Sequence, residues 1–400
     1  MKRLSTILFT SLLICLLCAG TRSGYAGEAR GVTDDTITIG VIADQTGVAA
    51  PVLVPATNGA RTYFRYINDQ GGINGRKVKI IVEDDRYTIP GAIAAFKKLV
   101  FRDKVLSVLF CGGLGQTYAL MPQIEKHKVP VIPVSTAEGL STPLKTYIFT
   151  SAASYDDEIK LCLDYIMKDL KAKNPKIAFV YPDVEFGKSG LRAIEKYLPN
   201  YNLKLSNKTV INLGEIDATS QVLVLKKENP DYIITDIALA GLVSFYKAAK
   251  KYDLGSKVLA GYAVNGDENI EIVGDAMKDT LVISSIGYWT DDTSGMAELR
   301  KITKKYHPET KRMFKNYTQG WLGSMICAEG LKRAGRNLNP DTLVEAYETF
   351  NNFSTGGISE PISYSKTNHK GGTMNKFYKV DVENQTFIPI SGFRKPAFKD

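Results

Sequence analysis

The chain has 400 residues, a formal net charge of +9, 44% hydrophobic residues and 23% charged residues. This composition is typical of a globular protein with a large core and excludes an intrinsically disordered chain, and the length is sufficient for two domains. The basic residues are spread along the sequence rather than clustered, so a nucleic-acid partner is not expected.

The first residues have the pattern of a secretory signal peptide. Lys2 and Arg3 precede an uncharged apolar stretch over residues 4–17, and residues 24–26 (GYA) place small residues at the two positions that a cleavage site requires. The apolar stretch is shorter than the roughly 20 residues of a membrane-spanning helix, which argues against the alternative, a membrane anchor. We therefore expect a signal peptide over residues 1–26 and an exported mature chain with a charge of 48 − 42 = +6.

Three cysteines remain in the predicted mature chain, Cys111, Cys162 and Cys327. Their wide spacing forms neither a disulfide framework nor a zinc-binding pattern. We expect no disulfide bond in this protein.

Short apolar strands alternate with amphipathic helices from residue 36 onward. In the first expected helix, residues 56–69, Ala60, Phe64 and Ile67 recur at helical spacing, and two glycines end the helix. Other expected helices include residues 90–101, 319–334 and 340–350. The expected strands are residues 37–42, 78–82, 106–110, 129–134, 147–150, 177–181, 232–235, 258–261 and 281–285, followed by three turn-separated strands of antiparallel type at residues 362–364, 377–380 and 386–389.

Alternation of this kind predicts an α/β fold with helices on both faces of parallel sheets. Nine strands and nearly as many helices exceed what one doubly wound sheet holds comfortably, so we expect two similar Rossmann-like lobes. A seam is expected near residues 151–154.

Two glycine-containing turns resemble nucleotide-binding motifs. Residues 187–189 (GKS) stand between a strand and a helix, as in a P-loop, but that motif needs a glycine at position 182, where the chain has Pro182. Residues 113–115 (GLG) begin a dinucleotide fingerprint whose third glycine would fall at Tyr118. Neither motif is complete, and no catalytic triad, metal-ligand spacing or cofactor signature replaces them. We expect neither an enzyme nor a cofactor.

Several motifs resemble the periplasmic leucine/isoleucine/valine-binding protein family. The most specific run is residues 67–76 (INDQGGINGR), preceded by residues 58–61 (NGAR) and followed by residues 83–85 (EDD). Weaker matches follow in the right order at residues 186–190, 217–220 and 360–364. The resemblance covers essentially all of the predicted mature chain.

The resemblance implies a type I periplasmic binding fold, in which two lobes are joined by three crossings and close over a ligand. Lobe one would comprise residues 27–152 and 286–352, and lobe two residues 153–285 and 353–400. The implied function is a monomeric periplasmic protein that delivers a small carboxylate-bearing ligand to the membrane permease of an ABC transporter. The alternative is an extracellular ligand-sensing module that acts with a separate membrane partner.

The family binds a ligand carboxylate with hydroxyl and backbone N–H groups of two loops in lobe one. The matching positions here are Gly113, Gly115 and Gln116 in the first loop, and Ser135 and Thr136 in the second. Both loops lead into a helix or a turn, where free N–H groups attract anions. Gly115 stands where the family has a serine, so Gln116 or the backbone would have to substitute. Helix capping is the alternative role for the two hydroxyls.

Lobe two departs from the family at the residue that binds an α-amino group. The acidic residue of the family matches Ala263 here, so either Asp236 replaces it or the ligand has no amino group. Phe186 and Tyr262 are expected to reach the cleft, with plain packing as the alternative. These residues favour an apolar or aromatic carboxylate as the ligand, with an amino acid of the branched-chain type a close second. The resemblance also implies an unpaired Cys111, because its partner position in the family holds Arg86-Tyr87 here.

Overall fold

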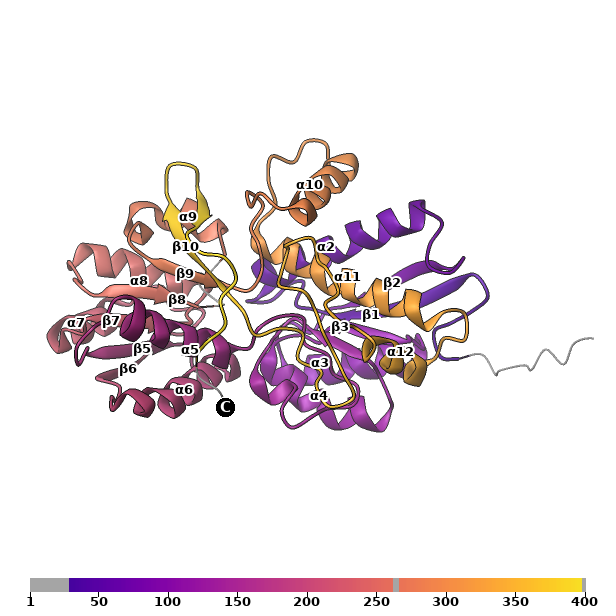
Figure 1. Cartoon of the computed structure of the whole chain (residues 1–400), viewed down its shortest axis with the longest axis horizontal. Helices are drawn as coiled ribbons and strands as arrows, with labels where there is room; N and C mark the ends of the chain where they lie inside the picture. The colour runs from indigo at the N-terminus through magenta and orange to yellow at the C-terminus, as the bar shows by residue number, and fades with distance from the viewer. Residues whose placement is uncertain (1–28, 262–265, 398–400) are drawn as a thin grey trace, which may run out of the picture.

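The computed structural model describes residues 29–261 and 266–397, which form two α/β lobes side by side (Figure 1). The predicted signal peptide, Tyr262 and Ala263 lie outside the described residues. In the described part of the chain, no helix is long and apolar enough to cross a membrane.

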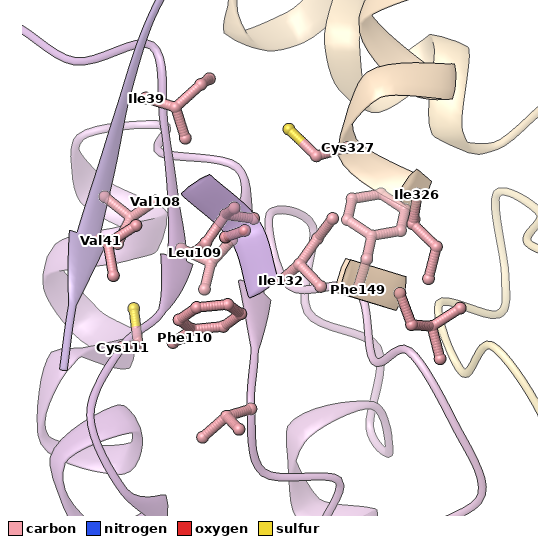
Figure 2. Packing of buried hydrophobic residues seen from close by; sticks show 14 of the residues in the cluster. Ile39, Val41, Val108, Leu109, Phe110, Cys111, Ile132, Phe149, Ile326 and Cys327 are labelled. Atoms are coloured by element: carbon pink, nitrogen blue, oxygen red, sulfur yellow. The ribbon is translucent and has the colours of Figure 1, made fainter. Parts of the chain in front are cut away.

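Lobe one contains a parallel four-stranded sheet with the order β2-β1-β3-β4. Apolar side chains of β1, β3 and β4 pack around Phe110, between the sheet and helix α11 (Figure 2). The strands of the sheet are β1 (Thr36–Ile42), β2 (Lys77–Glu83), β3 (Ser107–Phe110) and β4 (Val131–Pro133). The helices of lobe one are α2 (Ala50–Asp69), α3 (Ile89–Lys97), α4 (Leu114–Lys126), α10 (Ser294–Tyr306), α11 (Lys315–Ala334) and α12 (Pro340–Tyr347).

Helices α2 and α11 approach each other closely because each has a glycine at the contact. A Cβ atom on Gly320 would lie 1.8 Å from the carbonyl oxygen of Ala56, and one on Gly59 would lie 2.2 Å from that of Tyr317. Any larger residue at either position would force the two backbones apart. This packing fixes the N-terminus of α11 against lobe one.

Lobe two contains a seven-stranded sheet with the order β11-β10-β9-β8-β7-β5-β6. The strands β5 to β9 are parallel, and β10 and β11 join antiparallel at one edge. The strands are β5 (Ile177–Tyr181), β6 (Asn207–Val210), β7 (Tyr232–Thr235), β8 (Lys257–Ala260), β9 (Leu281–Ser284), β10 (Lys376–Asp381) and β11 (Thr386–Pro389). The helices are α5 (Tyr155–Asp164), α6 (Glu185–Tyr197), α7 (Thr219–Glu228), α8 (Leu239–Lys251) and α9 (Glu268–Val273).

The predicted strands and helices agree with this architecture, with four differences. Residues 147–150 form only isolated bridges from Ile148 to Val131 and from Thr150 to Lys370, and residues 362–364 form a single bridge, between Ile362 and Phe353. Strand β6 was not predicted, because its sequence NKTV is polar and partly exposed at the edge of the sheet. Helix α2 begins six residues earlier than expected, since Pro51 lies in its first turn, where a proline is tolerated.

Three segments connect the lobes, and the first and third lie side by side. Thr150 accepts hydrogen bonds at its carbonyl oxygen from the backbone of Gly371 (3.0 Å) and the hydroxyl of Tyr364 (2.9 Å). The third crossing comes later than the position expected near residue 352. Ile358, Ile362 and Tyr364 still pack in the core of lobe one, so the chain enters lobe two only on the way to β10. The short apolar runs in residues 353–364 have the pattern of strands, and this pattern does not show to which lobe they belong.

Candidate functional site

A partly open cavity of about 90 Å³ lies between the lobes, at the carboxyl ends of the parallel strands. The residues of lobe one around it are Ala49, Val52, Leu53, Tyr87, Gly112, Gly113, Val134, Ser135 and Asn316. The residues of lobe two around it, within the described part of the chain, are Tyr155, Phe186, Leu213, Ala238, Leu239, Gly266, Glu268 and Asn269. Most of this wall is apolar, and its polar groups lie at a few positions, which is the usual composition of a small-molecule site.

The cavity has the size of a small metabolite. One water molecule needs about 10–15 Å³ of such space, so the volume corresponds to roughly six to nine non-hydrogen atoms. A single amino acid or a small organic acid fits this range.

The wall of lobe one presents the N-terminus of α4. Gly113 is the N-cap residue, and no side chain of the described residues caps this helix. The first N–H groups of a helix have no partner within it and attract anions. Ser135 lies at the same wall and is 4% exposed, and its hydroxyl makes no hydrogen bond with the residues that the structure describes. Together these donors can bind a carboxylate.

Strained backbone and glycine shape this wall. Phe110, Cys111 and Gly112 have φ angles of 75°, 53° and 69°, a run in the left-handed region that turns the chain sharply after β3. A Cβ atom on Gly113 would lie 2.6 Å from the Tyr87 ring, so only glycine lets that ring pack on the loop. Strain of this kind is found mainly at functional sites.

A buried carboxyl group lies behind the same loop. A Cβ atom on Gly112 would lie 2.2 Å from Oδ2 of Asp85, and the other oxygen of Asp85 accepts a hydrogen bond of 3.0 Å from the backbone of Tyr87. Burial raises the pKa of Asp85 to about 6. Below that pH the group carries no charge that would repel a bound anion.

The wall of lobe two carries the acidic group of the cavity. The Oε1 atom of Glu268 accepts a hydrogen bond of 3.2 Å from Nδ2 of Asn316, which belongs to lobe one. The Oε2 atom is buried and has no hydrogen-bond partner among the described residues. Burial raises the pKa of this carboxyl group. A cationic group in the cavity would satisfy Oε2 and favour the ionised form.

Comparison with known proteins agrees with this geometry. The model of a family described as periplasmic binding protein matches residues 36–386. The chain belongs to this family. It is 23% identical over 280 residues to the leucine-specific-binding protein of Salmonella typhimurium, covering 69% of this chain and 75% of the relative.

Solved structures of the same architecture support the type I periplasmic binding fold. A branched-chain amino acid ABC transporter protein from Thermus thermophilus with bound valine has a TM-score of 0.84 at 22% identity, covering 92% of this chain and 98% of that one. A fatty acid ABC transporter substrate-binding protein from Thermomonospora curvata has a TM-score of 0.83 at 22% identity, covering 93% and 95%. At these identities the likeness shows the fold, and the expected fold class is confirmed.

Among the predicted site residues that the structure describes, Gly113, Ser135 and Phe186 line the cavity of this periplasmic binding protein. Phe186 is on α6 in lobe two but packs against the core of lobe one, so it bridges the cleft. Gly115 faces lobe two as well, since a Cβ atom there would lie 3.6 Å from Cβ of Glu185. This is an ordinary van der Waals distance, so the start of α4 has room for a small side chain at position 115.

The other predicted residues lie elsewhere. Gln116 and Thr136 are buried in lobe one, behind the cavity wall. Asp236 is buried beside Gly190 and Gly261, where added Cβ atoms would lie 2.4 Å from its two oxygens, and it does not line the cavity. Tyr262 and Ala263 lie outside the described residues.

Sequence reasoning missed Glu268 and its partner Asn316. Glu268 follows β8 by eight residues and opens α9, so its place at the carboxyl end of the sheet was a usable signal. The resemblance to the family instead placed the acidic position at Ala263, five residues earlier. Asn316 had no signal, because it reaches the cavity from the start of a helix that belongs to the other lobe.

Asp236 leads to a prediction about stability. Burial raises its pKa to about 7, above the usual value of 3.8. The folded state therefore loses stability as the pH rises from about 4 to about 7, where the unfolded chain ionises this group and the folded chain does not. Asp236→Asn removes this loss of stability. We expect the variant to melt a few degrees higher than the wild type at pH 8 and at nearly the same temperature at about pH 4, with ligand affinity little changed.

Calorimetric melting curves at the two pH values, with ligand titrations beside them, check this expectation. A large loss of ligand affinity in Asp236→Asn would instead place Asp236 in the binding site.

Proposed function

We propose that this protein is a periplasmic substrate-binding protein that captures a small apolar α-amino acid by hinge closure and delivers it to the permease of an ABC transporter. The family, the relatives and the cavity between two lobes support the transport role. The site residues and the ligand class rest on the chemistry of the cavity walls.

The observation that carries the ligand class is the opposition of two polar groups across an apolar cavity. Lobe one offers the N-terminus of α4 and the Ser135 hydroxyl, which suit a carboxylate. Lobe two offers Glu268, whose Oε2 is buried without a partner among the described residues. An α-amino acid carries a carboxylate and an ammonium group on one carbon atom, and its apolar side chain would contact Val52, Leu53 and Phe186.

Glu268 changes the preference drawn from the sequence. The missing acidic residue at Ala263 favoured a ligand without an amino group, but a carboxylate from α9 can take that role. A ligand that leaves Glu268 unpaired would bury either a lone charge or an unsatisfied carboxylic acid, and each costs free energy. An apolar carboxylate without an amino group therefore becomes the second candidate.

Such a ligand would also drive closure. Closure is favoured only by contacts that the ligand gains in the closed form. A zwitterion that bridges α4 of lobe one and Glu268 of lobe two gains both polar contacts only when the lobes approach each other. The bridging position of Phe186 adds an apolar contact of the same kind.

Titration calorimetry on protein freed of bound ligand by unfolding and refolding tests the ligand class. The probes are leucine, valine and phenylalanine, set against 4-methylpentanoate, the analogue of leucine without its amino group, and benzoate. We expect at least one amino acid to bind and its deaminated analogue to bind far more weakly. Binding of the organic acids with none of the amino acids would reject the proposed ligand class.

A further prediction concerns Phe186. Its side chain is half-buried at the cleft, and full burial of a phenylalanine contributes about 1.5–3 kcal/mol, so Phe186→Ala should weaken ligand binding roughly 10- to 100-fold. The melting temperature of the ligand-free protein should change little. Leu223, an exposed residue on α7, offers a control as Leu223→Ala, with unchanged affinity. A large drop in the melting temperature of free Phe186→Ala would show that Phe186 is a core residue instead.

A further inference from the structure

Helix α9 of lobe two and the start of α11 in lobe one meet at three contacts. The backbone N–H of Lys315 donates to Oδ1 of Asp267 at 2.9 Å, and Nδ2 of Asn316 donates to Oε1 of Glu268 at 3.2 Å. Just before α11, Arg312 forms an ion pair of 2.5 Å with Glu271. We call this set the α9–α11 contact.

The two sides of the α9–α11 contact belong to separate rigid units. Helix α11 is held on α2 by the close packing at Gly59 and Gly320, and its side chains Tyr317 and Trp321 lie in the core of lobe one. Ile270 of α9 lies in the core of lobe two. The contact therefore forms only when the lobes are together, because hinge motion carries α9 and α11 with different lobes.

The contact also supplies α11 with a cap from the other lobe. The N-cap residue of α11, Phe314, has a side chain that cannot cap the helix. Asp267 instead accepts a hydrogen bond from the backbone N–H of Lys315, the first residue of α11, across the cleft. A carboxylate at a helix N-terminus is favourable.

We propose that Asn316 is the positioning residue for Glu268, so that closure itself completes the ammonium site. The amide of Asn316 holds one oxygen of Glu268 and leaves the other, Oε2, for the ligand. In an open cleft Glu268 loses this partner. The inference rests on the proposed function and extends it: the protein discriminates the amino group only in the closed form.

The charged groups around Glu268 fit this role. Helix α9 contributes Asp267, Glu268 and Glu271, and α5 contributes Glu158, whereas the segment from lobe one contributes the cations Arg312 and Lys315. The carboxyl groups thus outnumber the cations at this point, and burial raises the pKa of Asp267 to about 7 and that of Glu268 above its usual value. A ligand ammonium group would add a third positive charge and favour the ionised form of Glu268.

The consequence is a selectivity that depends on Asn316. A ligand with an ammonium group gains from the oriented Glu268, whereas its deaminated analogue does not. Asn316→Ala should therefore reduce the preference for leucine over 4-methylpentanoate by roughly tenfold or more, the usual effect of a lost hydrogen bond to a charged group. The affinity for 4-methylpentanoate itself should change by less than about threefold, because its carboxylate would bind to lobe one.

The experiment measures both dissociation constants by titration calorimetry for the wild type, Asn316→Ala and Asn316→Gln. The glutamine variant keeps an amide donor and should recover part of the preference. Asn384→Ala, in the exposed turn between β10 and β11, is the control with an unchanged preference. If Asn316→Ala does not fold, Asn316→Ser takes its place.

The outcomes separate the two proposals. If the wild type prefers leucine over 4-methylpentanoate and Asn316→Ala shows the same preference, the positioning role of Asn316 alone is overturned. A parallel loss of affinity for both ligands would also overturn it, since that is what a merely structural residue would show. A wild type without any preference for the amino acid would overturn the proposed function and this inference together.

Discussion

Glu268→Gln is expected to lower the affinity for leucine by about 100-fold or more. The variant keeps the size of the side chain but removes the negative charge opposite the ligand ammonium group. Loss of one partner of a buried ion pair costs about 3–5 kcal/mol, which exceeds a factor of 100 in the dissociation constant. Binding of 4-methylpentanoate should be unchanged or tighter, because no charge would then have to be buried without a partner.

The control for this variant is Glu228→Gln, which removes an exposed carboxylate at the end of α7 in the same lobe. Calorimetric titrations of both variants with both ligands provide the comparison. Leucine binding within a few-fold of the wild type in Glu268→Gln would show that another group binds the ammonium.

Gly113→Val is expected to reduce binding of every carboxylate ligand by roughly 100-fold, near the upper end of the 1–3 kcal/mol that overpacking costs. The new Cβ atom would lie 2.6 Å from the Tyr87 ring and 2.8 Å from Oε1 of Gln116, so the ring has to move. Because Tyr87 lines the cavity, this movement changes the shape of the binding site. The loss should be similar for leucine and 4-methylpentanoate, since both would place a carboxylate at α4. This equality distinguishes the variant from Glu268→Gln.

Gly255→Val is the matched control, because nothing lies within 4 Å of a Cβ atom at Gly255. The titrations are accompanied by circular dichroism to show that each variant is folded. Full ligand affinity in a folded Gly113→Val would place the carboxylate site away from the N-terminus of α4.

The fold could be predicted well from the sequence because its signals are local and repeated. Buried parallel strands such as β3 and β5 are almost entirely apolar, and α2 shows the helical spacing of Ala60 and Phe64. Strand β6 was missed because an edge strand needs little apolar content. The third crossing was misplaced because residues 353–364 pack by tertiary contact without regular structure of their own.

The candidate site was predictable where it depends on residues that directly follow the strands of one sheet. Gly113 and Ser135 lie in turns directly after strands of one sheet, so strand order alone brings them to the same edge. The pair of Glu268 and Asn316 depends instead on how two lobes meet, and their positions are 48 residues apart in sequence. No local pattern encodes such a contact. Asp236 follows a strand in the same way, but its side chain packs beside Gly190 and Gly261, and position along a strand does not show which way a side chain turns.

The comparison of leucine with 4-methylpentanoate on the wild-type protein tests the central claim most directly. The claim is that the two lobes recognise the two charged ends of one amino acid, with Glu268 as the group for the ammonium. Titration calorimetry of ligand-free protein at pH 7.5 should give a dissociation constant for leucine at least about 100-fold lower than for the deaminated acid. Equal binding of the two ligands, or tighter binding of 4-methylpentanoate, would contradict the account.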